Sequence, residues 1–333
     1  MQPLIALANS APVQILRLPE LERAGVELSV WRLDRADAEA PGNKVFKLAE
    51  NLRAARAAGY ERVLSFGGAF SNHIHALARY GAAAGFATVG VIRGEDEAAA
   101  NPTLSDARQA GMTLHFVGRE WYRQRDSAAA YAELTARFGR CYIIPEGGAN
   151  DRGVSGCRAL GEAVALWPRV PDIVALPCGT GSTLAGLVAG LGNACAVLGI
   201  AVLKGADFLN DTVRAQLRAA GVDDGGRWRI DTRHHGGGYA RVSAALMEFI
   251  EDFRRRAGIP LEPVYTGKLF HALWRSIEAG EFARGTRLLA VHTGGLQGAR
   301  GFVYRGIAGR GQDGERRQAG LSAQAFSVTG FMV

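Results

Sequence analysis

Cysteine is scarce in this chain of 333 residues, and no metal-binding spacing is present. The four cysteines are isolated from one another, without a CxxC pair, at Cys141, Cys157, Cys178 and Cys195. The histidines add no site, because His73 and His75 would diverge on a helix and His234 lies in a glycine-rich segment. The pattern predicts reduced thiols, as in the cytoplasm, and no metal.

The chain also lacks any apolar run long enough to span a membrane. Its short apolar N-terminus has no basic segment before it, which makes it a poor signal peptide. We therefore expect a cytoplasmic protein without a membrane partner.

No dense basic cluster occurs outside the last residues, although the net charge is +7. The arginines are scattered, and only the tail around Arg310, Arg316 and Arg317 concentrates them. This distribution argues against a nucleic-acid partner. An anionic cofactor and an anionic substrate would also suit a basic protein.

Short β-branched segments alternate with helical stretches that are rich in Ala and Leu. The alternation predicts seven strands, at residues 62–66, 86–92, 113–117, 141–145, 172–177, 197–202 and 287–292. Strands that are apolar on both faces, alternating with helices, favour an α/β fold with parallel-rich sheets covered by helices. Residues 221–238, rich in Gly, Asp and Arg, are expected to form a loop.

Gly42-Asn43-Lys44 opens a predicted helix over residues 44–58. A lysine amine can form an imine with an aldehyde once burial or a nearby positive charge has lowered its pKa. The start of a helix supplies positive potential, and Lys47 lies one turn further on the same face. The alternative is that both are solvated helix lysines.

A glycine-rich turn, Gly179-Thr180-Gly181-Ser182-Thr183, directly follows an apolar segment. It lacks the Gly-Lys-Ser/Thr of a Walker A loop and the GxGxxG spacing of a dinucleotide site. It can hold a phosphate with backbone N–H groups and a helix dipole, or be a tight strand–helix turn. An amine and a phosphate cradle together suit one cofactor, pyridoxal 5'-phosphate.

Two further segments carry groups that catalysis uses. Ser71 or Asn72 follows a strand and can cap a helix, presenting N–H groups to an anion, or form a plain capping turn. Tyr239 and Tyr265 lie beside turn residues, where tyrosines donate protons, orient a substrate or simply pack.

Several segments in this order resemble the pyridoxal-phosphate family of D-cysteine desulfhydrase and 1-aminocyclopropane-1-carboxylate (ACC) deaminase. They are GNKVFKL, LSFGGAFSNH, IPEGGAN, PCGTGSTLAG, EPVYTGK and VHTGG, and they extend over residues 12–302. The resemblance implies the two-domain, tryptophan-synthase-β-like fold (fold type II) and a homodimer. It assigns residues 1–46 and 157–333 to a large cofactor-binding domain and residues 47–156 to a small domain.

The resemblance also implies roles for individual residues. Lys44 corresponds to the Schiff-base lysine, and Tyr239 and Tyr265 to two active-site tyrosines. Asn72 matches the residue that hydrogen-bonds the phenolic oxygen of the cofactor. Substrate contacts are expected from Ser71, Asn72 and His73, and phosphate contacts from residues 179–183.

Two positions separate the branches of this family. ACC deaminases carry glutamate where this chain has Thr266, facing the pyridine nitrogen of the cofactor, and leucine where it has Thr293. A neutral hydroxyl makes a weaker electron sink, which is adequate when thiolate leaves. The family's Lys-Arg-Asp/Glu-Asp segment before the Gly-Asn-Lys motif is also replaced here, by Trp31–Arg35.

The resemblance implies a lyase that converts D-cysteine to pyruvate, ammonia and sulfide. ACC deaminase or another D-amino-acid deaminase is the enzymatic alternative. A catalytically silent protein that binds pyridoxal phosphate is the alternative from another class. Residues 304–333 have few large apolar side chains and are expected to be a flexible tail that activity does not need.

Overall fold

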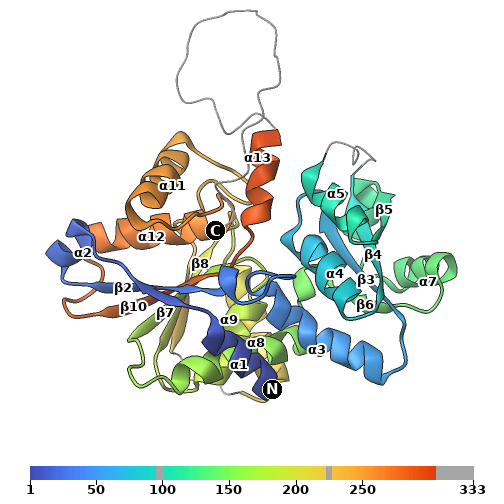
Figure 1. The fold of residues 1–333 in the computed structure, drawn as a ribbon, viewed down its shortest axis with the longest axis horizontal. Helices are drawn as coiled ribbons and strands as arrows, with labels where there is room; N and C mark the ends of the chain where they lie inside the picture. The colour runs from blue at the N-terminus through green and yellow to red at the C-terminus, as the bar shows by residue number, and fades with distance from the viewer. Residues whose placement is uncertain (95–100, 223–226, 305–333) are drawn as a thin grey trace, which may run out of the picture.

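The computed structural model describes residues 1–94, 101–222 and 227–304. In these ranges the chain forms two lobes, each built on one sheet (Figure 1). We call the lobe with six strands the large lobe and the lobe with four strands the small lobe. The predicted tail lies, apart from Tyr304, outside the described residues.

The sheet of the large lobe has one antiparallel edge. Its strands lie in the order β1 (Val13–Ile15), β2 (Glu27–Arg32), β10 (Arg287–His292), β7 (Ile173–Cys178), β8 (Ala196–Ala201) and β9 (Trp228–Asp231). Strand β1 is antiparallel to β2, and every other neighbouring pair is parallel. The sheet of the small lobe is parallel throughout, in the order β5 (Thr113–Val117), β4 (Ala87–Arg93), β3 (Arg62–Gly68) and β6 (Tyr142–Ile144).

Helices cover both sheets (Figure 1). Those of the small lobe are α4 (Asn72–Ala83), α5 (Pro102–Gln109), α6 (Arg119–Arg123) and α7 (Ala128–Phe138). The remaining ones are α1 (Gln2–Ser10), α2 (Pro19–Ala24), α3 (Lys44–Ala57), α8 (Asp151–Ala165), α9 (Ser182–Leu191), α10 (Phe208–Ala219), α11 (Ala244–Ala257), α12 (Thr266–Glu278) and α13 (Arg300–Tyr304). Short 3₁₀ turns form at η1 (Leu33–Arg35), η3 (Glu146–Gly148) and η4 (Leu296–Ala299).

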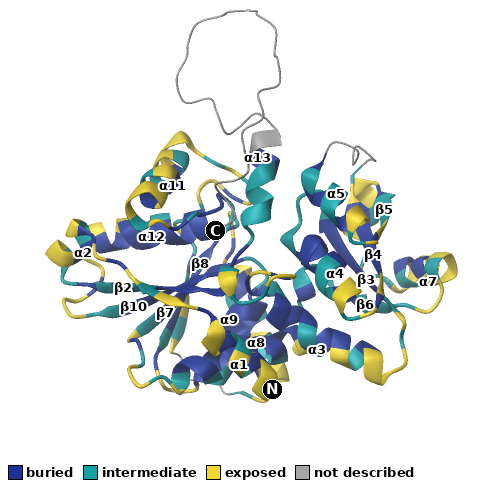
Figure 2. Cartoon of the chain, in the orientation of Figure 1, coloured by how far each residue is buried: buried dark blue, intermediate teal, exposed yellow. Residues whose placement is uncertain are grey.

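The central strands are buried on both faces, as their apolar sequences predict. In β10, Leu289 and Val291 join the core beneath α8 and α9, while Leu288 and Ala290 join the core beneath α11 and α12. The buried residues accordingly gather on the strands and on α8, α9 and α12, and exposed ones on the outer helices α2, α7 and α11 (Figure 2). The predicted α/β fold with parallel-rich sheets is confirmed.

All seven predicted strands are present, two with the predicted ends and five with ends shifted by one or two residues. The loop predicted over residues 221–238 is wrong in part, because Trp228–Asp231 forms β9 at the edge of the large sheet. An edge strand of four residues leaves Arg229 exposed, so its sequence reads as polar. Strands β1 and β2 were not predicted either.

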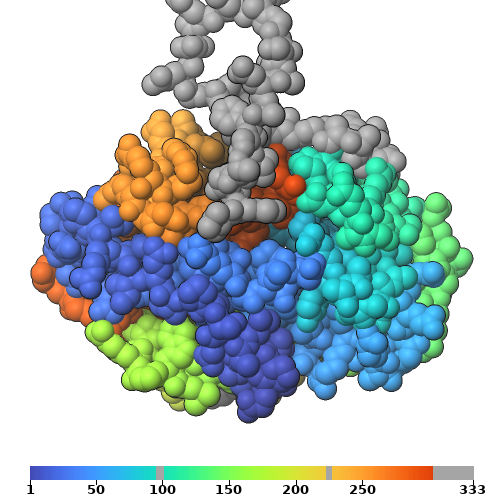
Figure 3. Space-filling model, in the orientation of Figure 1, coloured from blue at the N-terminus to red at the C-terminus, as the bar shows by residue number. Residues whose placement is uncertain are grey.

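The chain before β3, which ends in α3, lies between the two lobes (Figure 3). In the space-filling view, α11 in orange and the small lobe in cyan and green lie on opposite sides, with the blue N-terminal segments between them (Figure 3). None of the helices that the structure describes combines the length and the apolar character needed to cross a membrane.

Helices α8 and α9 pack backbone against backbone. A Cβ atom on Gly161 would lie 2.2 Å from the carbonyl oxygen of Leu187, and one on Gly190 would lie 2.1 Å from that of Arg158. Neither contact leaves room for a methyl group. Glycine is therefore required where the two helices cross.

This contact predicts that Gly161→Ala destabilises the protein although alanine is the better helix former. Overpacking should lower the free energy of unfolding by about 1–3 kcal/mol, more than the gain of about 1 kcal/mol in helix propensity. Urea unfolding measures the change. Gly118→Ala is the control, because no atom lies within 4 Å of its Cβ position and its φ is −63°. Equal stability of the two variants would contradict the prediction.

Candidate active site

A cavity of about 750 Å³ lies between the lobes, at the carboxyl ends of β3, β4 and β7. Ligand sites in parallel α/β sheets form at these strand ends, because helix N-termini and loops meet there. Most of the predicted site residues line it, namely Lys44, Ser71, Asn72, His73, Gly179, Thr180, Gly181, Thr183, Tyr239, Tyr265 and Thr293. Ser182 and Thr266 are buried behind its wall.

Backbone contacts with the large lobe place Lys44 at the start of α3. Gly42 pairs with Gly294, and its Cβ position is only 2.1 Å from the carbonyl oxygen of Thr293. The N–H of Asn43 donates to the same carbonyl at 3.1 Å. Because Gly42 also has a φ of 106°, no other residue fits this turn.

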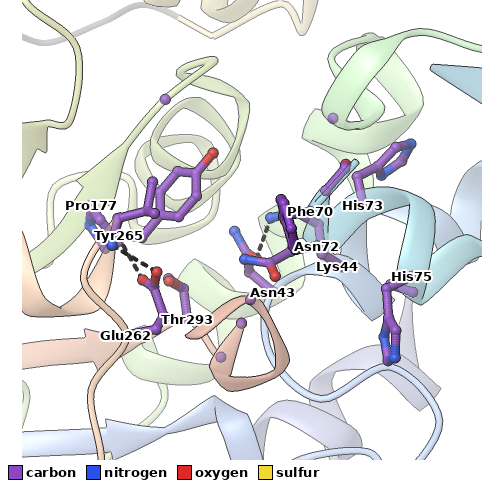
Figure 4. A pocket seen from close by; sticks show the side chains of 18 of the residues that line it. Asn43, Lys44, Phe70, Asn72, His73, His75, Pro177, Glu262, Tyr265 and Thr293 are labelled. Atoms are coloured by element: carbon purple, nitrogen blue, oxygen red, sulfur yellow. Dashed lines mark hydrogen bonds between the residues drawn. The ribbon is translucent and has the colours of Figure 1, made fainter. Parts of the chain in front are cut away.

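The amine of Lys44 is set up to be neutral. Burial and the nearby positive charge of Lys47 lower the pKa of Lys44 to about 7. Lys44 Nζ donates to Asn43 Oδ1 at 2.8 Å and lies 6.0 Å from the centre of the Tyr265 ring (Figure 4). A large fraction of this amine is therefore nucleophilic at neutral pH.

An anion cradle stands beside Lys44. Helix α9 starts at the predicted glycine-rich turn, with Gly181 as its N-cap, and no side chain caps its N–H groups. Lys47 Nζ donates to Thr180 Oγ1 at 3.2 Å, and Asn43 Nδ2 donates to Thr183 Oγ1 at 2.8 Å. Free N–H groups, a helix dipole and a cation suit a phosphate. The sequence placed Lys47 near Lys44 but did not assign it to the phosphate.

The residues present therefore fit pyridoxal phosphate. A neutral amine, an anion cradle and a cavity of about 750 Å³ match its aldehyde, its phosphate and its size. Among the described residues, no group of three or more His, Cys, Asp or Glu side chains is placed to hold a metal ion.

The two predicted tyrosines lie together across from Lys44. Their rings meet edge to face with centroids 6.1 Å apart. Burial raises the pKa of Tyr265 well above its ordinary value. The pKa of Tyr239 is raised too by the burial of its hydroxyl end, although 49% of the residue's surface is exposed, so both hydroxyls keep their protons. Lys268 Nζ holds the loop before Tyr239 by donating to the carbonyl of Gly238 at 2.5 Å.

Thr266 and Glu262 form the start of α12. The Glu262 carboxylate accepts N–H groups from Val264, Tyr265 and Thr266 at 2.6–2.8 Å, and the Thr266 hydroxyl accepts from the Glu262 N–H at 2.9 Å. Figure 4 shows Glu262 beside Thr293 at the cavity wall. The sequence missed Glu262, although a carboxylate just before a helix start is a capping signal.

Helix α4 presents Ser71 and Asn72 to the cavity. Ser71 is the N-cap of α4, and its Oγ accepts from the N–H of Ile74 at 3.3 Å, as the sequence suggested. His73 lies 2.8 Å from Ser65 Oγ through Nε2, and burial lowers its pKa to about 3. It is therefore a neutral ring, pointing away from Lys44 in Figure 4, and its role toward substrate remains a prediction.

Two charged residues of the small lobe were not singled out from the sequence. Arg93, at the end of β4, and Glu146, in η3, line the same cavity. Glu146 pairs with Arg125 at 3.1 Å, and the Arg93 guanidinium lies 5.4 Å from the centre of the Tyr122 ring. They give the small-lobe wall a cation and an anion.

The unusual segment before Lys44 forms a buried ion pair. Arg32 Nε donates to Asp34 Oδ1 at 2.8 Å, and both side chains are less than 5% exposed. His292, at the end of β10, lies 3.2 Å from the same carboxylate. The N–H of Gly42 donates to the carbonyl of Leu33 at 2.9 Å, so this cluster supports the turn that carries Lys44.

Comparison with known proteins identifies related chains. The profile of the family described as "Pyridoxal-phosphate dependent enzyme" matches residues 9–294. A bifunctional D-cysteine desulfhydrase/ACC deaminase of Arabidopsis thaliana is 31% identical, over 86% of this chain and 76% of that protein. A Pyrococcus horikoshii protein provisionally named an ACC deaminase is 30% identical, over 86% of this chain and 90% of its own length.

Solved structures share the fold. The crystal structure of an ACC deaminase homologue superimposes with a TM-score of 0.79 at 26% identity, covering 92% of this chain and all of that one. Threonine deaminase isoform 2 of Solanum lycopersicum, at 16% identity, has a TM-score of 0.63, over 92% of this chain and 85% of that one, and shows the fold alone. The predicted fold type II architecture is confirmed.

The lowered pKa of Lys44 predicts the pH dependence of its reaction with an aldehyde. Only the neutral amine attacks, so the rate of reaction with pyridoxal should rise with pH and level off above about pH 8. An ordinary lysine would continue to gain rate toward about pH 10. Rapid-mixing absorbance on cofactor-free protein measures this, and pyridoxal avoids the titration of a phosphate. Lys44→Arg should remove the fast phase, and a wild-type rate still climbing at pH 10 would refute the assignment.

The buried pair beside the Lys44 turn predicts a large effect on stability. Asp34→Asn leaves the Arg32 guanidinium buried without a counter-charge, which should cost about 3–5 kcal/mol in the free energy of unfolding. Glu251→Gln breaks the exposed pair with Arg254 and should cost less than about 1 kcal/mol. Urea titrations of both variants test the contrast, which a loss below 1 kcal/mol for Asp34→Asn would disprove.

Proposed function

The chain belongs to the pyridoxal-phosphate dependent enzyme family, and from that premise we propose that it is a D-cysteine desulfhydrase. One molecule of D-cysteine and one of water would give pyruvate, ammonia and hydrogen sulfide. The observation that carries the proposal is the neutral amine of Lys44 facing two protonated tyrosines across the cavity. That arrangement supplies a base on one side and proton donors on the other.

The cofactor would be held by groups already described. Lys44 carries it, while the N–H groups of residues 179–183 and the Lys47 ammonium hold its phosphate. When bound, pyridoxal phosphate supplies an aldehyde that condenses with amines and a ring that delocalises negative charge from Cα.

The protein's own groups would then move the protons. The amine of Lys44, neutral near pH 7, takes the proton from the substrate Cα. The N–H groups at the start of α4, with the Ser71 hydroxyl, receive the substrate carboxylate. Tyr265 or Tyr239 gives its proton to the departing sulfur and recovers one from water.

The cavity wall near the two branch-specific threonines favours a thiolate leaving group. Glu262 is the carboxylate closest in sequence to Thr266, and three backbone N–H groups already engage it. Thr293 presents only a neutral hydroxyl to the cavity. A site without a free carboxylate there gives a weak electron sink, which suffices for thiolate loss and not for opening a strained ring.

ACC deamination is the second candidate function, because the names of two relatives include it. Another D-amino-acid deaminase on the same scaffold, and a silent binder of pyridoxal phosphate, are further alternatives. A silent binder would show a bound visible chromophore and no turnover. The expected homodimer remains a prediction that light scattering would test.

The substrate assignment predicts a ratio of activities. Purified holoenzyme should release sulfide and pyruvate from D-cysteine with a kcat/KM at least about tenfold above that for 2-oxobutanoate and ammonia from ACC, or about 1.4 kcal/mol. Thr293→Leu should narrow this ratio, because it removes the hydroxyl from the cavity wall. Thr135→Leu, on the exposed face of α7, is the control. Faster turnover of ACC than of D-cysteine by the wild type would sink the proposal.

A further inference from the structure

The side chain of Asn72 enters a loop of the other lobe. Asn72 is the first residue of α4 in the small lobe, and the loop at residues 294–298 follows β10 in the large lobe. A Cβ on Gly295 would lie 2.4 Å from Asn72 Nδ2, and one on Gly298 would lie 3.0 Å from Asn72 Oδ1. The absence of side chains at both positions makes room for the Asn72 amide.

A short run of hydrogen bonds joins the Asn72 amide to Gln297 and Thr103. Thr103 Oγ1, fully buried on α5, donates to Gln297 Oε1 at 2.9 Å. Gln297 Nε2 then donates to Asn72 Oδ1. With the oxygen of Gln297 on Thr103, the nitrogen on the other arm of the same amide faces Asn72.

The same run leaves the nitrogen of Asn72 for a ligand. Its Oδ1 is engaged, whereas Nδ2 donates to none of the residues that the structure describes and is not sealed off from the cavity. Asn72 and Lys44 line that cavity together. A free amide N–H beside the cofactor-carrying amine favours an anionic oxygen at that point.

We propose that Gln297 is a positioning residue, which holds the Asn72 amide so that Nδ2 donates to the phenolic oxygen of the cofactor. This inference rests on the proposed function as far as the cofactor is concerned. A hydrogen bond to the charged form of a group favours that form. Correct orientation of Asn72 therefore lowers the pH at which the cofactor's phenolic oxygen and its neighbouring nitrogen lose their shared proton.

The residues of this hydrogen-bonded run come from both lobes. Thr103 and Asn72 belong to the small lobe, and Gln297 reaches between them from η4 of the large lobe. Arg300, one turn beyond Gln297, pairs with Asp106 of α5 across the same junction. The amide is thus oriented only while the lobes are in contact.

The test exchanges the hydrogen-bonding character of residue 297 in the holoenzyme. Gln297→Glu can only accept, so Asn72 must turn its nitrogen toward residue 297 and its oxygen toward the cofactor. Gln297→Leu removes the N–H that donates to Asn72 but gives the Asn72 amide no reason to rotate. Arg300→Gln changes the net charge by the same unit as Gln297→Glu and breaks the ion pair across the junction, leaving the Thr103–Gln297–Asn72 bonds in place.

The readout is the pH midpoint of the cofactor's visible absorbance, which requires no turnover. We expect the midpoint of Gln297→Glu to rise by at least one pH unit, a tenfold change in the proton equilibrium. The midpoint of the Gln297→Leu variant should rise by less, and that of the Arg300→Gln variant should stay within a few tenths of a pH unit of the wild type. A general structural role for Gln297 would instead make the leucine variant the most affected.

Two further outcomes overturn the inference. One is an unchanged midpoint in both residue 297 variants, and the other is an equal shift in Arg300→Gln, which would make charge or lobe contact the cause. If Gln297→Glu does not fold, the leucine variant decides by its shift or lack of one. A normal set of shifts in a protein that turns over neither D-cysteine nor ACC would refute the proposed function and leave this inference standing.

Discussion

Two lysine amines share one wall of the cavity, and the cost of holding two positive charges there governs the site. Lys44 and Lys47 lie one helical turn apart at the start of α3, and burial lowers the pKa of both. The hydrogen-bond acceptors of both amines are neutral. Lys44 donates to an amide oxygen, and Lys47 donates to a hydroxyl and a backbone carbonyl. A dianionic phosphate in the adjoining cradle would balance this charge better than any of these groups.

The hydrogen bonds behind the Gly42-Asn43-Lys44 turn show what the segment Trp31–Arg35 does in this chain. Trp31–Arg35 differs from the family pattern, yet its Arg32 and Asp34 neutralise each other inside the protein. The main-chain carbonyl of Leu33 then binds Gly42. The turn before Lys44 requires a fixed backbone, and in this chain the Arg32–Asp34 ion pair holds the segment to which the turn is hydrogen-bonded.

The sequence predicted those features whose cause is local. Seven strands followed from runs that are apolar on both faces, and the helix beginning at Lys44 and the Ser71 cap followed from residues within one turn. Strands β1 and β9 were missed because each is a short edge strand interrupted by a polar residue, Gln14 or Arg229, whereas the equally short β6 has an uninterrupted apolar sequence. Gln297 was missed because its importance lies in Asn72, 225 positions away. Glu262 was missed although its partners, Val264 to Thr266, are local. Thr266, which was matched by motif, is engaged within the start of its own helix, and its contact with the cofactor stays a prediction.

The two ends of the catalytic cavity differ in how firmly they are attached. The N–H of Asn43, next to Lys44, donates to the carbonyl of Thr293 in the large lobe. Helix α3 also packs on α8 so closely that a Cβ on Gly156 would lie 1.9 Å from the carbonyl oxygen of Phe46. Ser71 and Asn72 stand on the far side of the cleft, on α4. A rotation of the small lobe would thus have its pivot near the base of α3. Lys44 would stay still while Ser71 and Asn72 move away, so that a ligand could leave the cavity without displacing the lysine.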